Sequence, residues 1–273
     1  MDEASQRVAA MFEDLAEDYD RSGVDFFQPI AAGLLERVPP APGERWLDVG
    51  CGPGAVLLPA AAAVGPSGLV VGIDVADAMV QRARAAADDS GLSNVDVLVG
   101  DAASPPEGPF DVVVSSLVLF FLSDPAAALR AWREVLVPAG RLGVTTFGRT
   151  DDRLLDIEEV LLPYAPASMR DPRTVGDESP FLTDAGVERL VSGAGYAQVR
   201  TETFALPVRF ADAEHWYAFS WSIVQRGMWR AVPPEKRALV RAEAARRFQQ
   251  HADADGSATF TIDVRCTLAT APG

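Results

Sequence analysis

Apolar residues recur at helical spacing over the first forty positions of the chain. Between residues 8 and 19 they are separated by four, three and four positions, which predicts one helix with a single buried face. A second helix is expected from about Phe26 to Val38, where the run Pro39–Gly43 breaks it. The stripe of the first helix consists of Val8, Phe12, Leu15 and Tyr19.

From Glu44 onward, short apolar strands alternate with helices. This alternation indicates a parallel sheet with helices on both faces. One local conflict is Pro59, which falls inside the helix expected over 54–64, where a proline removes a hydrogen bond and kinks the axis. The expected strands are Trp46–Val49, Leu69–Ile73, Val95–Val99, Phe110–Ser115 and Arg141–Phe147, and the expected helices are Gly54–Val64, Ala76–Ser90 and Pro125–Val137.

Beyond Phe147 the alternation loosens, and helices are inserted between the last strands. We expect these insertions, at about 150–182 and 212–252, to form a helical lid on the core. The expected helices are Arg153–Leu162, Asp184–Ser192, Asp212–Arg230 and Pro234–His251, and the expected strands are Val199–Arg209 and Ala258–Leu268. The chain then divides into an N-terminal helical cap, 1–43, and one domain with its lid, 44–273.

Charge and composition exclude several classes of function. The 273 residues carry 24 Lys and Arg against 39 Asp and Glu, a net charge of −15, which disfavours nucleic acid as a partner. No apolar run reaches the roughly 18 residues of a membrane span, and the N-terminus does not resemble a signal peptide. Cys51 and Cys266 lie far apart without metal-ligand spacing, so we expect a cytoplasmic protein without a metal.

A glycine-rich turn follows the first expected strand, where α/β proteins bind nucleotides. Gly50, Gly52 and Ala55 also satisfy the dinucleotide pattern G-x-G-x-x-A, so an NAD(P)-dependent oxidoreductase remains an alternative. Asp48 precedes the first glycine, where a carboxylate suits an ammonium group better than a pyrophosphate. Asp74, which ends the second strand, has the position of a ribose-binding acid in either interpretation.

Several motifs in a fixed order resemble the class I S-adenosylmethionine (SAM)-dependent methyltransferases, particularly their UbiE-like small-molecule branch. The matching stretches cover about residues 44 to 147, and the upstream FEDLAEDYD (12–20) is similar to the N-terminal helix of that family. The stretches are LDVGCGPG (47–54), VVGIDVADAMV (70–80), VLVGDAA (97–103), FDVVVSSLVLFFL (110–122) and ALRAWREVLVPAGRLGVTTF (128–147). The resemblance implies a Rossmann-like, doubly wound sheet of seven strands, mostly parallel with an antiparallel last strand.

The same resemblance implies SAM as the cofactor and assigns residues to it. The turn that includes Gly50, Gly52, Pro53 and Gly54 would cradle SAM, with Asp48 facing its ammonium group. The remaining assignments are Asp74 to the ribose hydroxyls, Val75 and Met79 to packing around the adenine, Asp101 and Ala102 to the adenine edge, Ser116 to the methionine end and Tyr19 to closure over the cofactor.

The catalytic base and the methyl acceptor are less well defined. Many relatives have a histidine where this chain has Phe120 and Phe121, and His215 is the candidate base that remains near the lid. The aromatic residues around His215 suggest an apolar or aromatic acceptor, such as a bacterial secondary metabolite or a quinone-like molecule. A methyltransferase fold that has been repurposed as a cyclase or a binding module is a further alternative, and the sequence does not indicate an oligomeric state.

Overall fold

A single seven-stranded sheet organises the protein, whose computed structural model describes residues 2–166 and 179–273. The strand order is β3-β2-β1-β4-β5-β7-β6. The first five strands are parallel, and β7 pairs antiparallel with both β5 and β6, as predicted. The strands are β1 (Arg45–Val49), β2 (Leu69–Asp74), β3 (Val95–Val99), β4 (Phe110–Ser116), β5 (Leu136–Thr150), β6 (Ala197–Phe210) and β7 (Ala258–Thr270).

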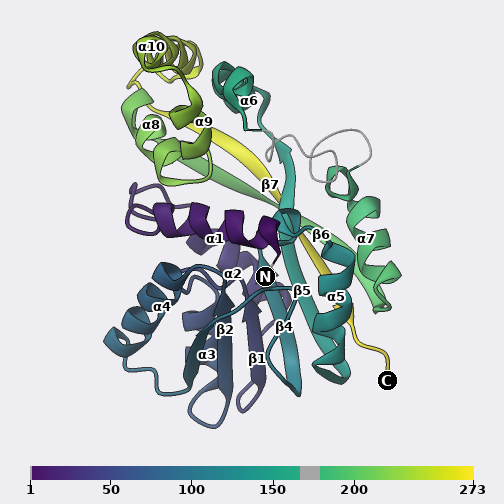
Figure 1. Ribbon diagram of the computed structural model, residues 1–273. Helices are drawn as coiled ribbons and strands as arrows, with labels where there is room; N and C mark the ends of the chain where they lie inside the picture. Colours follow the sequence, from purple (N-terminus) through teal and green to yellow (C-terminus); the bar gives the residue numbers. More distant parts are fainter. Residues whose placement is uncertain (1, 167–178) are drawn as a thin grey trace.

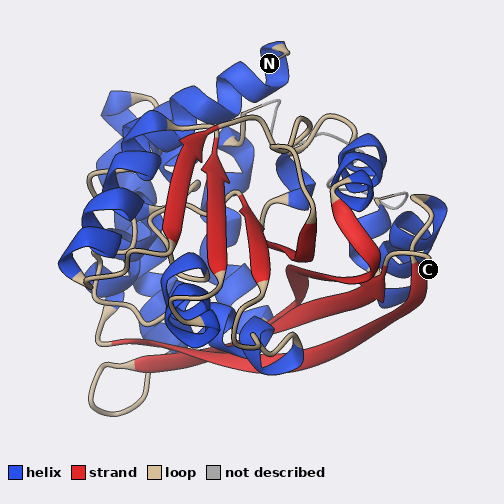
Figure 2. Ribbon diagram, turned by 90° about the horizontal axis from the view of Figure 1, so that it is seen from below, coloured by secondary structure: helices blue, strands red, loops and turns tan. Residues whose placement is uncertain are grey.

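Helices cover both faces of the sheet (Figure 2). On one face, residues of α2 (Phe27–Arg37), α3 (Leu57–Val64) and α4 (Asp77–Asp89) belong to one apolar cluster with the buried Trp46 of β1. On the other face, residues of α5 (Pro125–Glu134) and α7 (Asp184–Gly193) share a second cluster with Leu47 and Val49 of the same strand. Successive side chains of a strand point to opposite faces, so the nearly continuous apolar run of β1 fits a strand that is buried on both sides.

The remaining helices gather beyond one end of the sheet, where the long strands β6 and β7 extend (Figure 1). Helix α6 (Asp152–Glu158) follows β5, while α8 (Ala213–Ser222), α9 (Arg226–Ala231) and α10 (Pro234–His251) connect β6 to β7. Helix α1 (Glu3–Leu15) lies between this group and α4 (Figure 1). Short 3₁₀ helices occur at η1 (Leu119–Phe121), η2 (Glu159–Tyr164) and η4 (Pro180–Leu182).

Several expected boundaries differ from those in the structure, among them the start of β5, which begins at Leu136 where a helix to Val137 was expected. Helix α3 begins at Leu57, not at Gly54, so Pro59 lies in its first turn, where backbone N–H groups lack intrahelical partners and a proline is tolerated. Helix α1 ends at Leu15, and the chain turns before Tyr19. The helix expected over 212–230 is divided into α8 and α9, because Ile223 has an extended conformation.

Part of the first expected insertion, residues 167–178, lies outside the described residues. Over the described ranges, every helix is too short or too polar to cross a bilayer.

Candidate active site

The glycine turn after β1 has the backbone conformation that its sequence predicts. Gly50, Gly52 and Gly54 all have positive φ angles, of 72°, 51° and 104°, which glycine adopts without steric cost. A Cβ atom on Gly50 would come within 2.3 Å of Val118, whereas one on Gly52 would meet nothing within 4 Å. The turn therefore packs closely against the end of β4 on one side and leaves open space beside Gly52.

Asp48 is a buried carboxylate in need of a partner. Its side chain is 1% exposed, and neither carboxylate oxygen has a hydrogen-bond partner among the described residues. Burial and, secondarily, the charge of Asp74 raise its pKa to about 7, an effect that the nearby Leu57 N–H offsets in part. A buried, unpaired acid of this kind suits the ammonium group of SAM, because that cation would satisfy both its charge and its oxygens.

Asp74 is fixed by the glycine turn at the end of β2. One carboxylate oxygen accepts the Gly52 N–H at 2.9 Å, and the other accepts the Ala76 N–H at the same distance. Burial raises the pKa of Asp74, and these backbone hydrogen bonds oppose the increase. Each carboxylate oxygen keeps a second lone pair, so a ribose with two hydroxyl groups fits this acid.

The ends of β3 and β4 complete the edge of the sheet. Asp101 accepts the Ala103 N–H at 3.0 Å, and the Ala102 carbonyl accepts the indole N–H of Trp132 at 2.7 Å. Ser116 hydrogen-bonds through its hydroxyl to that of Thr145 at 2.9 Å. Leu117 follows with a φ angle of 60°, a left-handed conformation that is strained for a bulky residue and is often found at functional sites.

Tyr19 lies just beyond α1 and stacks on Phe27, with ring centroids 4.5 Å apart. Burial and, secondarily, the charge of Asp74 raise the pKa of its phenol, and both residues line one cavity. Arg82 of α4 holds this segment in place by donating to the carbonyls of Ala16 and Tyr19 at 2.6 and 2.9 Å.

A cavity of about 290 Å³ unites these elements with the lid. It reaches from the glycine turn to side chains of α6, α8 and the α8–α9 connection. Asp48, Pro53, Gly54 and His215 are not among its lining residues. The predicted site residues that line it are Tyr19, Gly50, Gly52, Asp74, Val75, Met79, Asp101, Ala102 and Ser116.

His215 does not have the environment of a catalytic base. Its Nδ1 accepts the Ala211 N–H at 3.1 Å, and its Nε2 lies 3.0 Å from the Ser22 carbonyl, to which a neutral ring would donate. Both ring nitrogens are therefore engaged with the backbone, and neither is free to accept a proton from a substrate. The ring instead attaches the lid to the segment between α1 and α2.

The aromatic cluster expected around His215 mostly serves packing. Among Trp216, Tyr217, Phe219, Trp221 and Trp229, Phe219 lines the cavity, and the indoles of Trp216 and Trp229 pack edge to face in the core of the lid. Other phenylalanines make the cavity apolar, although their sequence positions gave no such indication. They are Phe12, Phe26, Phe27, Phe120, Phe121, Phe147 and Phe210.

The sequence also gave no indication of Glu158 and Gln225, which both line the cavity. The Gln225 amide donates to the Glu158 carboxylate at 2.7 Å, and burial raises the pKa of Glu158 to about 7. Glu158 is one of several acids over residues 151–159, and its partner is 67 positions away. No local pattern distinguishes it from its neighbours. Across the described residues, no group of three or more His, Cys, Asp or Glu side chains is arranged to hold a metal ion.

Comparisons with known proteins agree with this geometry. Residues 40–180 match a family described as "Methyltransferase domain". The chain is 39% identical over 267 residues to nocamycin O-methyltransferase of Saccharothrix syringae, a match that covers 93% of this chain and 95% of that protein. It is 36% identical over 209 residues to aklanonic acid methyltransferase DauC of Streptomyces sp. (strain C5), covering 72% and 95% of the two chains.

The fold also has relatives among solved structures. The YcgJ protein from Bacillus subtilis superposes with a TM-score of 0.57 at 18% identity, over 90% of this chain and 99% of that one. This likeness concerns the Rossmann-like fold alone. The family match and the relatives support methyl transfer from SAM over the oxidoreductase alternative. The chain belongs to the methyltransferase-domain family and is a SAM-dependent methyltransferase.

Proposed function

We propose that the protein transfers the methyl group of SAM to an oxygen atom of a small, apolar, ring-containing molecule. The observation that carries this proposal is the shared cavity, in which the polar edge of the sheet and the phenylalanines of α2 and the lid line one space. An acceptor bound among the phenylalanines would lie next to the cofactor. Pockets for small molecules commonly combine such apolar walls with a few polar groups that fix orientation.

The assignments of residues to SAM belong to this proposal. Asp48 faces the ammonium group and Asp74 the ribose hydroxyls, while Gly50, Gly52, Pro53 and Gly54 shape the turn. Val75 and Met79 pack against the adenine, Asp101 and Ala102 meet its polar edge, and Ser116 lies at the methionine end. Support comes from the unpartnered oxygens of Asp48, the backbone hydrogen bonds of Asp74 and the cavity lining.

Bound SAM supplies a methyl group that its sulfonium already activates, so the protein mainly has to position the acceptor and exclude water. We propose that residues 1–43 act as a cap over the cofactor, with Tyr19 at its inner side, and that the helices inserted around 150–182 and 212–252 act as the lid. The contact of Arg82 with the Tyr19 carbonyl and the position of α1 between α4 and α9 support this division of roles.

The names of the two relatives favour a bacterial secondary metabolite as the acceptor, since one is a nocamycin O-methyltransferase and the other methylates aklanonic acid. A quinone-like acceptor has weaker support from more distant UbiE relatives. Cys51 and Cys266 are free thiols, which supports the proposal of a cytoplasmic protein.

The experiment has two arms. In the first, thermal unfolding is followed with SAM, S-adenosylhomocysteine or NADH, and we expect an increase in melting temperature with the first two alone. In the second, the protein is incubated with SAM and probe acceptors that carry an acidic hydroxyl on an apolar ring system, 1-naphthol and 4-hydroxycoumarin, and methyl ethers are sought by mass spectrometry. Binding of SAM without methylation of either probe would contradict the acceptor class and favour a cyclase or a binding module.

A further inference from the structure

Glu158 is an acidic side chain in the lid half of the cavity, which is otherwise mainly apolar. It lines the cavity together with Leu154, Phe219 and Ile223, and Gln225 fixes its carboxylate through a hydrogen bond of 2.7 Å. An ionised carboxylate in apolar surroundings is costly unless a cation or several donors compensate for it. Its position therefore raises the question of what it binds.

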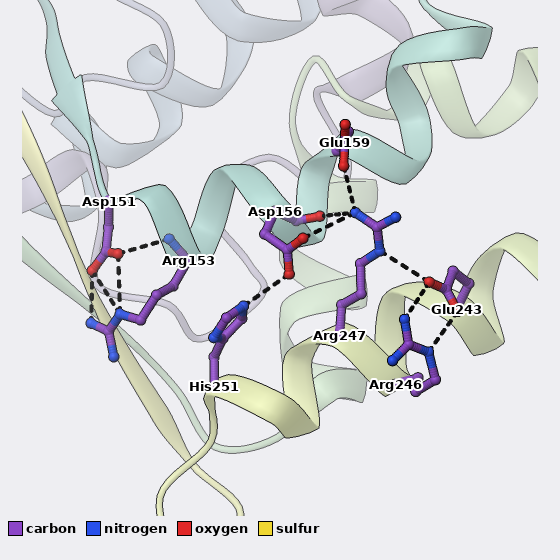
Figure 3. A network of polar contacts seen from close by, with 8 residues as sticks. All are labelled: Asp151, Arg153, Asp156, Glu159, Glu243, Arg246, Arg247 and His251. Carbon is purple, nitrogen blue, oxygen red and sulfur yellow. Dashed lines mark hydrogen bonds and ion pairs between the residues drawn. The ribbon is translucent and has the colours of Figure 1, made fainter.

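The neighbouring acids differ from Glu158 because each has an arginine partner (Figure 3). Asp151 pairs with Arg153 at 2.7 Å, and Asp156 and Glu159 both pair with Arg247 of α10, at 3.1 and 2.7 Å. His251 adds a contact of 2.9 Å to Asp156. Within the part of the chain that the structure describes, the polar contact found for Glu158 is the neutral amide of Gln225.

Helical geometry explains the difference. Successive residues of a helix are about 100° apart, so Asp156 and Glu159, three positions apart, share one face, and Glu158 lies on another. Arg247 occupies the first face, and the cavity lies at the second. The network around Arg247 thereby fixes the rotation of α6 and keeps Glu158 directed into the cavity.

The basic side chains that α9 and α10 direct toward this region pair with acids other than Glu158. Arg247 and His251 of α10 contact Asp156, and Arg226 of α9 pairs with Asp18 at 2.5 Å. The pKa of Glu158 is raised to about 7 by burial, which the hydrogen bond from Gln225 opposes, and no charged group of the described residues contributes to the shift. A group that titrates near neutral pH inside a substrate cavity has the properties of a general base.

We propose that Glu158, oriented by Gln225, binds the hydroxyl group of the methyl acceptor and removes its proton. This inference rests on the proposed function. The hydroxyl proton passes to a carboxylate oxygen of Glu158, and the acceptor oxygen uses its electron pair to form the new C–O bond. The C–S bond breaks, its electron pair stays on sulfur, and Glu158 releases the proton to water after the product leaves.

The test compares wild-type protein, Glu158→Gln and Glu158→Asp with 1-naphthol as the acceptor, because 4-hydroxycoumarin is already ionised at neutral pH and offers no proton for a base to remove. At saturating SAM, we expect kcat/KM of the wild type for the acceptor to fall below about pH 7. Glu158→Gln should lower kcat at pH 8 by about 100-fold or more, the range of general base catalysis, and remove this acid limb. Glu158→Asp should restore part of the rate. The dissociation constant of SAM, measured by calorimetry, should change by less than about twofold.

Asp152→Asn is the matched control, because it removes an exposed acid of the same helix that pairs with Arg149 and not with Arg247, and it should leave kcat and the pH profile unchanged. If the wild type methylates 1-naphthol and Glu158→Gln keeps its rate within about threefold or retains the acid limb, the role of Glu158 is overturned while the proposed function stands. The same holds if the wild type methylates 4-hydroxycoumarin but not 1-naphthol, because an acceptor that is already ionised needs no base. If the wild type binds SAM and methylates neither probe, the proposed acceptor class fails, and this inference fails with it.

Discussion

At the scale of single residues, Asp48 destabilises the ligand-free protein, and in the complex we expect it to bind the ammonium group of SAM. The pKa of Asp48 is about 7 in the folded protein and 3.8 in the unfolded chain. Between these two pH values the folded protein keeps a proton that the unfolded chain has already released. The free energy of unfolding therefore falls as the pH rises through this interval. An ammonium group beside Asp48 would reverse the effect, since it favours the ionised carboxylate.

Asp48→Asn should consequently have opposite effects on stability and on binding. At pH 8 we expect the ligand-free variant to be more stable than the wild type, by at most about 4 kcal/mol, because about 1.4 kcal/mol corresponds to each unit of the shift from 3.8 to about 7. At pH 5 the difference should shrink to less than about 2 kcal/mol, because little more than one pH unit separates this value from the unfolded pKa of 3.8. Urea denaturation at both pH values measures this difference. Calorimetry should show weaker SAM binding to the variant, and equal affinity would contradict the contact with the ammonium group.

Asp74→Ala tests the ribose assignment. We expect the affinity for SAM to fall at least tenfold, because the carboxylate is lost as a hydrogen-bond acceptor for two hydroxyl groups. The variant should remain folded, although the loss of hydrogen bonds to Gly52 and Ala76 should lower its melting temperature by a few degrees. Asp88→Ala, at an exposed site on α4, is the control. An unchanged dissociation constant would refute the assignment.

Residues at the sheet edge were predictable, whereas residues in the lid were not. Asp48 and Asp74 end strands and flank a glycine turn, so their positions follow from the order of the elements along the chain. The environment of Glu158 depends on Gln225 from another element, and that of His215 on the carbonyl of Ser22, 193 positions away. Tertiary contacts of this range leave no local signal in a single sequence.

At the scale of elements, α1 connects the cofactor side of the molecule to the lid. Glu13 accepts the Ala78 N–H near the start of α4, and Arg226 of α9 donates to the Asp14 carbonyl at 2.8 Å and to Asp18. Arg226 is 4% exposed, so its charge depends on these partners. The hydrophobic stripe predicted the helix, while its end at Leu15 and the extended conformation of Ile223 between α8 and α9 were not apparent from the pattern.

Arg226→Ala should separate α1 from the lid. We expect a loss of stability of about 2 kcal/mol, below the usual value for a buried pair because Asp14 and Asp18 are half-exposed. Amide hydrogen exchange should become faster over residues 3–19. Arg230→Ala removes an exposed pair with the same Asp14 and should cost less than about 1 kcal/mol. Equal effects of the two substitutions would show that burial of Arg226 does not matter.

At the scale of the whole molecule, three layers of contacts enclose one cavity. The sheet edge supplies the polar groups, α1 and Tyr19 cover the cofactor side, and α2, η1, the strands β5 to β7 and the lid helices share the remaining apolar wall (Figure 1). The sheet itself is held by strand pairing and by helices on both faces, which do not include α1. Binding and folding are therefore partly separable in this architecture.

Deletion of residues 2–22 tests this separation. The truncated chain keeps α2, whose Ala31 and Leu34 belong to the core of the sheet, so far-UV circular dichroism should still show a folded protein with a cooperative thermal transition. Its affinity for SAM, measured by calorimetry, should fall tenfold or more, because Tyr19 is lost and the cofactor becomes open to water. Arg226→Ala, which loosens α1 without removing it, should give an intermediate affinity. A truncated protein that binds SAM as tightly as the wild type would show that the cap does not cover the cofactor, and the closing element would then have to be the lid alone.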